Sequence, residues 1–487
     1  MRILGISEGS HDAAWCLIED GEILEAHHQE RHSRLKNDKW LDASLLPKAD
    51  VVVGHQILAN VNDRRKWLGQ DPIPRNIHVD HEYNHHETHA WAGWATSPFD
   101  DCDILTVDAV GEWDTATVHK VRDGVWTKTF GMKYPKSYGM AYSQVTEKLG
   151  YRAMQDEYKV MAMAPLGGRY DRNDGKLFGL KDSVPHLAPM FEGSSVHQHY
   201  LFGHRYENTY FSFDSKQKIR DLARNVQAHY EFYLENLVAK HTSHDNLILM
   251  GGCALNCVAN TNIRKLVKDM WIMPNPGDAG SALGAAARHY GKKLNWEGPY
   301  LGTYVPKMDP RKIVDALLNT GIAAVCSERA EFGPRALGNR SLLADPRVDK
   351  GSAIWRRLKE LKHKDEYWRP FAPAILSEHF SAYFDWTANE YMQFVTTLKE
   401  HRKEQLPYND SHNDYPLITH VDRTSRVQIV GPKHGNSVIR EVLELWYKET
   451  GCPMLVNTSL NQKGEPIVNT LDDYKKFIEW SKLDDLS

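Results

Sequence analysis

Alternating apolar runs and polar turns predict two similar groups of three β-strands in the N-terminal part of the chain. Each group has the order strand, polar turn, strand, Asp-Gly pair, strand, and an Asp-Gly pair in this position is typical of a β-hairpin. The expected strands cover residues 2–7, 13–18 and 22–26 in the first group and 103–107, 115–121 and 125–130 in the second. Because the two groups lie about 100 residues apart, they predict an internal duplication.

Further periodic segments complete an α/β pattern. Apolar spacing predicts helices at 82–95, 137–149, 216–240, 309–320 and 436–450 and short strands at 51–55, 76–79 and 246–250. The segment at 296–310 is rich in Gly, Pro and Tyr, and we interpret it as a linker. We therefore expect a duplicated α/β domain over residues 1–300 and a second α/β domain over residues 301–487. By analogy, the duplication suggests the architecture of actin and the sugar kinases, with a cleft between the halves.

Composition changes this picture little. Of the 487 residues, 41% are hydrophobic and 25% are charged, which is average for a globular protein. The net charge of −4 excludes a global field that attracts nucleic acid or an anionic membrane, although it leaves a local basic groove open. The first residues enter a strand at once, no apolar run approaches a membrane span, and the six cysteines are scattered. We therefore expect a cytoplasmic protein without a membrane partner.

A histidine pair followed by an acidic residue is the most distinctive polar constellation. His85 and His89 are four residues apart, so one helix would present both imidazoles on the same face. Asp108 ends the apolar run 104–107, which predicts a buried strand that delivers a carboxylate to a loop. This ligand set suits iron(II), with zinc or manganese as alternatives, and Asp278 is a candidate fourth ligand. An isolated histidine pair is also typical of a helix surface or a hydrogen-bonded core, but the nearby Asp108 favours a metal.

Glycine-rich turns follow two apolar runs. Gly251 and Gly252 come directly after the strand expected at 246–250, where backbone N–H groups and a helix N-terminus favour an anion. A second small-residue turn contains Gly277 beside Asp278. Lys159 could meet a phosphate, and the alternative is a solvated lysine beside an apolar helix. Because glycines also serve tight turns, these features alone are weak indicators of a nucleotide site.

The C-terminal part contains arginines in apolar surroundings. They are Arg335, Arg340, Arg347, Arg369 and Arg426. Arginines among Gly, Pro and Leu do not resemble a solvated helix face, and a guanidinium group binds phosphate or carboxylate with two hydrogen bonds. Asn457, at the end of an apolar run, can add a further hydrogen bond to a ligand. The alternative is a set of structural arginines in buried ion pairs.

Ten segments, in this order and over nearly the whole chain, resemble the O-carbamoyltransferases of the nodulation-factor and cephalosporin type. They are GSHDAAWCLIEDG, HHETHA, LTVDAVGEWDT, EYKVMAMAPLG, GGCALNCVAN, NPGDAGSALGAA, EFGPRALGNRSLLADPR, RPFAPAIL, HVDRTSRVQIV and LVNTSLNQKGEPIV. The shared order and spacing make this resemblance specific.

The resemblance implies an actin-like N-terminal domain of the universal tRNA-modification (Kae) type and an α/β YrdC-like C-terminal domain. In such enzymes the C-terminal domain joins carbamoyl phosphate to ATP, which is supplied with Mg²⁺, and gives carbamoyl adenylate and pyrophosphate. The N-terminal domain then passes the carbamoyl group to an acceptor hydroxyl.

The resemblance also implies residue roles, carried over by position. His85, His89, Asp108 and Asp278 would bind Fe²⁺ or a similar divalent metal that holds the nucleotide phosphate. His11 would lie at the transfer site and take the proton of the acceptor hydroxyl. The nucleotide would be held by Gly251, Gly252 and Asn256, with Lys159 and Gly277. The adenylate-forming site would be lined by Arg335, Asn339, Arg340, Arg369, Arg426 and Asn457.

The sequence departs from the family pattern in two places, one at the metal-binding turn and one that bears on the acceptor. Ala109 follows the metal-binding Asp108 where the family usually has Gly. The chain also ends soon after Phe477 and is compact for the family, so we expect shorter loops and a more open acceptor cleft. The acceptor is therefore either a hydroxyl of a sugar or natural product, or a hydroxymethylated pyrimidine such as 5-hydroxymethylcytosine in DNA. The sequence leaves the oligomeric state open.

Two rival function classes stand beside this one. An actin-like ATPase or sugar kinase would use magnesium and carboxylates and would not need His85, His89 or the arginine-rich second domain. The other class is a non-catalytic nucleotide binder.

Overall fold

A computed structural model describes residues 1–168, 178–181, 184–187, 216–349, 351–363, 368–399, 415–432 and 437–487. The chain forms two compact units. The N-terminal unit contains Met1–Gly9, Leu17–Glu22 and Ala43–Asn295, and the C-terminal unit contains Ser10–Cys16, Ile23–Asp42 and Trp296–Ser487. The sequence pattern did not indicate that residues 10–16 and 23–42 group with the C-terminal part. The assignment of one activity to each side of residue 300 stays a prediction.

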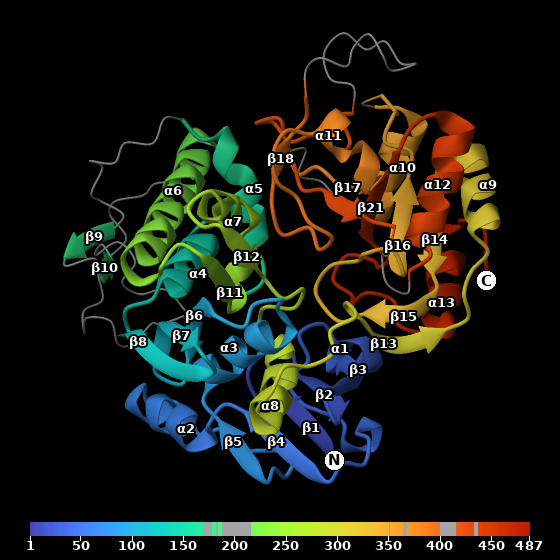
Figure 1. The fold of residues 1–487 in the computed structure, drawn as a ribbon. Helices are drawn as coiled ribbons and strands as arrows, with labels where there is room; N and C mark the ends of the chain where they lie inside the picture. Colours follow the sequence, from blue (N-terminus) through green and yellow to red (C-terminus); the bar gives the residue numbers. More distant parts are fainter. Residues whose placement is uncertain are drawn as a thin grey trace. The chain divides into compact units, whose positions relative to one another are not determined.

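The first sheet has the strand order β3-β2-β1-β4-β5 (Figure 1). Its strands are β1 (Arg2–Ser7), β2 (Ala14–Glu19), β3 (Glu22–His28), β4 (Val51–His55) and β5 (His81–Tyr83). Because β1, β4 and β5 run parallel, their carboxyl ends lie at one edge of the sheet. Ile3, Ile6 and Val53 are fully buried, which explains why these short apolar runs form central strands.

The second sheet repeats this arrangement. Its order is β12-β11-β6-β7-β8, and its strands are β6 (Cys102–Gly111), β7 (Asp114–Arg122), β8 (Val125–Lys133), β11 (Asn246–Met250) and β12 (Asp269–Trp271). β6, β7 and β8 form an antiparallel meander, whereas β6, β11 and β12 run parallel. In both sheets the first strand is central, with its two successors on one side and two later strands on the other. This topology confirms the predicted duplication and the α/β class.

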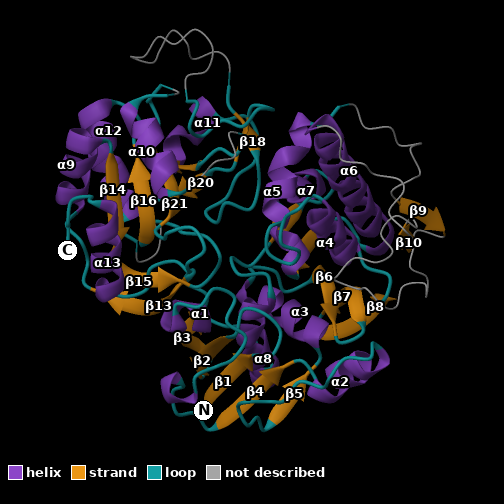
Figure 2. Cartoon of the chain, turned by 180° about the vertical axis from the view of Figure 1, so that it is seen from behind, coloured by secondary structure: helices purple, strands orange, loops and turns teal. Residues whose placement is uncertain are grey.

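Helices fill the space between and around the two sheets. Those of the N-terminal unit are α2 (Leu58–Trp67), α3 (His85–Thr96), α4 (Tyr138–Lys148), α5 (Glu157–Met163), α6 (Lys216–His241), α7 (Cys257–Arg264) and α8 (Ser281–Tyr290). α8 packs against β1 and β4, and α3 packs against α8 and against β6 and β11 (Figure 2). The α3–α8 pair is therefore the layer between the two sheets. None of the described helices has the length and apolar character needed to cross a membrane.

Two expectations about local structure were wrong. The strand expected at 76–79 is absent, because the backbone N–H groups of Asn76 and Ile77 donate to the carboxylate of Glu8, both at 2.9 Å, rather than to a neighbouring strand. The expected linker at 296–310 contains a strand, β13 (Tyr300–Val305), which pairs antiparallel with β15 (Glu328–Glu331).

The C-terminal unit is built on a mixed sheet with the order β14-β16-β21-β17-β20. These strands are β14 (Ile322–Cys326), β16 (Arg340–Ala344), β17 (Ala372–Leu376), β20 (Gln428–Val430) and β21 (Met454–Ser459). The helices are α1 (Gln29–Ser33), α9 (Pro310–Thr320), α10 (Ala353–Leu361), α11 (Phe380–Tyr383), α12 (Ile439–Thr450) and α13 (Leu471–Ser481). Short pairs of strands complete the described chain: β9 (Phe178–Lys181) with β10 (Val184–Leu187), and β18 (Thr396–Thr397) with β19 (Thr424–Ser425). The core of this unit includes the fully buried side chains of Trp446 and Tyr474.

Candidate functional site

Helix α3 carries both predicted histidines and is fixed at each end. Its N-cap residue Asn84 accepts a hydrogen bond from the backbone N–H of Glu87 at 3.3 Å. At the other end, the ammonium group of Lys293 donates to the carbonyl oxygens of Trp94 and Phe99, both at 2.6 Å. A cation at the carboxyl end of a helix satisfies free carbonyls and complements the helix dipole. The helix expected at 82–95 therefore exists, beginning at His85.

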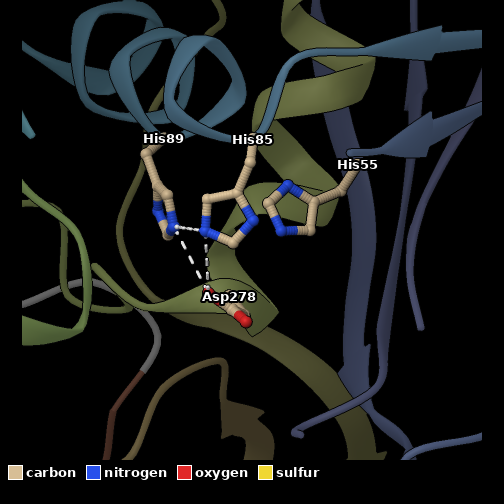
Figure 3. A group of neighbouring side chains, drawn as sticks. All are labelled: His55, His85, His89 and Asp278. Carbon is tan, nitrogen blue, oxygen red and sulfur yellow. Dashed lines mark hydrogen bonds and ion pairs between the residues drawn. The ribbon is translucent and has the colours of Figure 1, made fainter. Parts of the chain in front are cut away.

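The four predicted metal ligands converge in one buried cluster (Figure 3 shows three of them). Asp108 Oδ2 lies 3.2 Å from Nε2 of both His85 and His89. Asp278 Oδ1 lies 3.5 Å from His85 Nε2 and 3.3 Å from His89 Nε2. With metal–ligand bonds of about 2.1 Å, neighbouring ligand atoms stand about 3.0–3.4 Å apart. The cluster therefore has the donor atoms and spacing for one divalent ion.

Asp108 does not end its strand as the sequence suggested. β6 continues to Gly111, but its pairing with β7 is irregular between Val107 and Gly111. Asp108 Oδ1 accepts a hydrogen bond from the N–H of Ala109 at 2.7 Å, which leaves Oδ2 to face the imidazoles. An irregularity in a strand is a common way to direct a side chain into a site.

The charges and hydrogen bonds of the cluster shift the pKa values of His89 and Asp108. Burial lowers the pKa of His89, but the hydrogen bonds that its ring donates to Asp108 and Asp278 outweigh burial and raise this pKa to about 9. Burial would raise the pKa of Asp108, but the hydrogen bonds of His85 and His89 hold it well below its usual range. The cluster thus keeps Asp108 ionised, as a carboxylate that binds a metal must be.

Two residues of this region were missed by the sequence analysis. His55 ends β4, and its ligand atom lies within 4.8 Å of those of His85, His89 and Asp278. Burial, followed by the charge of His85, lowers the pKa of His55 well below its usual value. The available signal was a histidine at the carboxyl end of a predicted strand.

Glu112 is the second missed residue. Its Oε1 accepts hydrogen bonds from the backbone N–H groups of Ile57 and His85, at 2.9 and 3.0 Å. Its Oε2 accepts from the amides of Asn60 and Asn84, at 2.9 and 2.8 Å. The buried carboxylate thus fixes the start of α3, where a negative charge is also favoured by the helix dipole.

The glycine turns lie beside the metal cluster. Gly251 has a φ of +93°, and a Cβ atom there would stand 2.1 Å from the carbonyl oxygen of Val107, so the turn requires glycine. A Cβ at Gly252 would stand 3.1 Å from Asp108 Oδ1, and a Cβ at Gly277 would stand 3.9 Å from the Cα of Gly252. The two predicted glycine turns therefore meet next to Asp108.

The other two residues predicted to bind the nucleotide have protein partners. Asn256 is the N-cap of α7, where its Oδ1 accepts from the N–H of Ala259 at 3.1 Å. Lys159 forms an ion pair with Asp156 at 2.9 Å. Their roles toward a nucleotide stay predictions.

Arg340 has a structural environment. Its side chain is fully buried, and its guanidinium donates to backbone carbonyl oxygens, including those of Ser327 and Thr303 at 2.8 Å and Asn469 at 2.9 Å. These bonds occupy Nε, Nη1 and Nη2, so we assign Arg340 to holding the strands and loops together. Arg340 is thus buried as the alternative interpretation expected, but these partners are carbonyl oxygens rather than the carboxylates of an ion pair, and its role at the adenylate-forming site stays a prediction.

Asn339 and Asn457 are also buried and hydrogen-bonded within the unit. The amide of Asn339 donates to the carbonyl of Arg329 at 2.8 Å, and that of Asn457 donates to Gln428 Oε1 at 2.7 Å. Arg335, Arg369 and Arg426 are half-buried and lie in the same compact unit. These three arginines therefore keep the exposure that an anion-binding role needs.

Lys362 is a further cation that the sequence did not single out. Its ammonium group donates to the carbonyl oxygen of Ser459 and to Asn461 Oδ1, both at 2.7 Å. Burial, followed by the positive charges of Lys36 and Arg369, lowers the pKa of Lys362 to about 7. Ser459 Oγ at 3.2 Å and the Asn461 carbonyl oxygen at 3.0 Å also accept from this group, so an anionic ligand would meet its positive charge and would have to replace one of these acceptors.

His11 belongs to the C-terminal unit and forms a pair with Asp12. The distance from His11 Nδ1 to Asp12 Oδ2 is 2.9 Å, and Asp12 Oδ1 accepts from the amide of Asn37 at 2.7 Å. Burial raises the pKa of Asp12, but the hydrogen bond and charge of His11 outweigh it and lower this pKa. An ionised Asp12 can only accept, so Nδ1 of His11 carries the hydrogen of this bond.

Comparison with known proteins gives two family matches. A model described as carbamoyltransferase N-terminus matches residues 74–287, and one described as carbamoyltransferase C-terminus matches residues 314–487. The chain is 30% identical to the nodulation protein NolO of Bradyrhizobium diazoefficiens, with 80% of this chain and 75% of that protein covered. It is 29% identical to an uncharacterized protein of Synechocystis sp., with 98% and 94% covered.

Two solved structures show a more distant similarity. HypF of T. kodakarensis is 12% identical, with 60% of this chain and 47% of that chain covered, at a TM-score of 0.35. A ROK family glucokinase of Streptomyces griseus is 11% identical, with 59% and 98% covered, at a TM-score of 0.27.

The cluster predicts that His89 is needed to retain metal. His89→Ala should weaken binding of a divalent ion by more than about 100-fold, since even residues that only support a ligand are worth about 10- to 100-fold. The metal content of the protein after gel filtration, measured by elemental mass spectrometry, checks this result. Unchanged metal content in a folded variant would exclude the assignment.

Proposed function

The chain belongs to the carbamoyltransferase family, and from this premise we propose that it is an ATP-dependent O-carbamoyltransferase. In the first half-reaction, carbamoyl phosphate, water and ATP give carbamoyl adenylate, pyrophosphate and inorganic phosphate. In the second, the carbamoyl group passes to an acceptor hydroxyl and AMP leaves.

The observation that carries the proposal is the cluster of two buried imidazoles and two buried carboxylates. A kinase or ATPase that works with Mg²⁺ needs oxygen ligands, whereas imidazoles suit transition metals. His85, His89, Asp108 and Asp278 would hold such a metal, and we favour Fe²⁺. When bound, a divalent cation offsets negative charge on the phosphate of the nucleotide. The N–H of Gly251 donates to the carbonyl oxygen of Pro276 at 2.9 Å, so we assign the contact with the same phosphate to the N–H of Gly252, whose turn adjoins Asp108.

Adenylate formation is assigned to the cations of the C-terminal unit. Lys362 and Arg369 lie close enough for their charges to interact, and Arg335 and Arg426 are half-buried in the same unit. We assign these side chains to the phosphates of carbamoyl phosphate and ATP, because charge-assisted hydrogen bonds to phosphate are strong and directional. Arg340 acts indirectly, by fixing the loops around it.

Transfer is assigned to the His11–Asp12 pair. The hydroxyl oxygen of the acceptor forms a bond to the carbamoyl carbon, and the bond from that carbon to the AMP oxygen breaks. His11 Nε2 takes the proton of the hydroxyl, while Asp12 holds Nδ1–H and stabilises the imidazolium that results. AMP leaves with the electron pair of the broken bond.

The acceptor is a hydroxyl of a sugar or natural product, and the alternative is a hydroxymethylated pyrimidine in DNA. The proposed reactants, ATP with Mg²⁺ and carbamoyl phosphate, are cytoplasmic metabolites, so we also propose a cytoplasmic location.

One assay separates this proposal from its rivals. Purified protein is incubated with ATP, Mg²⁺ and carbamoyl phosphate, and we expect pyrophosphate to form only when carbamoyl phosphate is present. Formation of ADP would instead support a kinase or ATPase, and no nucleotide turnover would support a binding protein. Mass spectrometry of a panel of sugars, hydroxylated natural products and DNA with 5-hydroxymethylcytosine then identifies the acceptor by one added carbamoyl group.

Lys362 predicts a specific pH dependence of adenylate formation. Only the protonated lysine attracts an anion, so kcat/KM for carbamoyl phosphate should fall as the pH rises through about 7, the pKa of Lys362 in the free protein. Lys362→Arg should remove this fall, because arginine stays charged. Lys362→Met should reduce kcat/KM by about 10- to 150-fold, since a hydrogen bond to a charged group is worth about 1.5–3 kcal/mol.

Lys359→Met is the matched control for Lys362, because Lys359 lies in the last turn of α10, for which Lys362 is the C-cap residue, and its Nζ lies over the Trp355 ring. Pyrophosphate release is the measurement. The Lys362→Met variant should still consume carbamoyl adenylate supplied from outside. Loss of both activities in a folded variant, or a flat pH profile in the wild type, would contradict the assignment.

The His11–Asp12 pair predicts a selective loss of transfer. His11→Ala and Asp12→Asn should each reduce carbamoyl transfer by at least about 100-fold, the usual worth of general-base catalysis, while adenylate formation and melting temperature stay unchanged. His78→Ala, with a side chain that is 90% exposed, is the control. Variants that transfer within about tenfold of wild type would show that another group deprotonates the acceptor.

A further inference from the structure

His55 belongs to strand β4, which carries none of the predicted ligands, yet its imidazole lies beside theirs (Figure 3). Figure 3 shows it beside His85, with His89 beyond and Asp278 below. The ring centroids of His55 and His85 are 4.3 Å apart. We propose that His55 Nε2 is a further metal ligand, so that three imidazoles bind the ion together with the carboxylates. The inference rests on the metal centre of the proposed function and adds to its ligand set.

The hydrogen bonds of Thr88 determine which nitrogen of His55 is protonated. The Thr88 hydroxyl donates its only hydrogen to the carbonyl oxygen of His85 at 2.8 Å. His55 Nδ1 lies 2.6 Å from the same hydroxyl oxygen, which can therefore only accept from it. Nδ1 of His55 must carry the hydrogen, and Nε2 carries a bare lone pair. Metal-binding histidines are commonly fixed in this way, by a hydrogen bond from the ring nitrogen that does not bind the metal.

The lone pair of His55 Nε2 is buried and has no hydrogen-bond partner among the described residues. His55 is 1% exposed, so the lone pair is also shielded from bulk water. A buried acceptor without a partner is costly, and a metal ion at this point would satisfy it.

The spacing of the ligand atoms agrees with coordination. All four ligand atoms of His55, His85, His89 and Asp278 lie within 4.8 Å of one another. Ligands on opposite sides of an octahedral ion stand about 4.2 Å apart when the bonds are about 2.1 Å long. The upper limit of 4.8 Å exceeds this span by about 0.6 Å, so small side-chain movements bring the four residues to bonding distance of one ion.

A third imidazole has a consequence for the choice of metal. Nitrogen ligands strengthen binding of Fe²⁺, Co²⁺ and Zn²⁺ and do little for Mg²⁺, which prefers oxygen. The centre should therefore keep its metal in the presence of the Mg²⁺ that accompanies ATP.

His86 provides a matched control on the same helix. It is fully buried, its Nδ1 lies 3.2 Å from the hydroxyl of Thr117, and its Nε2 also lacks a partner among the described residues. It is not a member of the ligand group. His55→Ala and His86→Ala thus remove equivalent buried imidazoles, of which only one is proposed to bind metal.

The test is titration of the full-length, metal-stripped protein with Co²⁺ in competition with a chelator. His55→Ala should weaken Co²⁺ binding by more than about 10-fold. It should also intensify the visible absorption bands of Co²⁺, because the coordination number falls. The Co²⁺ affinity of His86→Ala should stay within about threefold of wild type. Equal effects of the two variants, or a wild-type affinity and spectrum in His55→Ala, would overturn the inference. A wild-type protein that binds no Co²⁺ would overturn the metal centre itself.

A second pair of variants covers the case in which His55→Ala does not fold. Thr88→Val removes the acceptor that orients His55 but keeps the shape of the side chain, and Thr88→Ser keeps the hydroxyl. We expect Thr88→Val to weaken Co²⁺ binding by about 10- to 100-fold and Thr88→Ser to restore it. Binding of wild-type strength in Thr88→Val would count against His55 as a ligand.

Discussion

The arrangement of the N-terminal unit depends on two carboxylates, Asp108 and Asp278, held against imidazoles away from water. A lone carboxylate in such a place is strongly unfavourable, and it is tolerated only with a partner of opposite charge or several hydrogen bonds. In the metal-free protein the proton on His89 partly compensates the two negative charges. A divalent cation compensates them fully, so the cluster is better suited to an ion than to the proton that it holds without one.

Such a cluster works only if the elements that carry it are fixed. α3 lies between the two sheets, with Asn84 and Glu112 at its start and Lys293 at its end. Gly111 contributes by its lack of a side chain, since a Cβ atom there would stand 2.0 Å from the His85 ring. None of these residues offers a donor to the metal. They decide instead where the imidazoles stand, which is a common role of the residues around a metal centre.

The parts predicted well from the sequence are those in which local pattern and final structure coincide. The repeated strand pattern gave the duplication, and the spacing of His85 and His89 gave one helical face with two imidazoles. Contacts between distant segments were not predictable in this way. His55 is oriented by Thr88, and Lys362 donates to Asn461, although these partners are distant in sequence. The guanidinium of Arg340 donates to carbonyl oxygens of several loops. The strand expected at 76–79 does not form, because the backbone N–H of Asn76 donates to the distant carboxylate of Glu8 instead of to a neighbouring strand.

Each of the two units is formed by segments that are not continuous in sequence, and this limits how the chain can be divided into fragments. The polypeptide passes from one unit to the other five times, after residues 9, 16, 22, 42 and 295. A fragment that begins at Trp296 lacks His11 and Asp12, and it also lacks Arg31 and Arg34, which donate to the carbonyls of Gly333 and Ile467. The converse fragment keeps residues 10–16 and 23–42 without the surface on which they rest. No single cut in the polypeptide therefore separates the two units, and variants meant to isolate one of them need a circularly rearranged chain rather than a truncation.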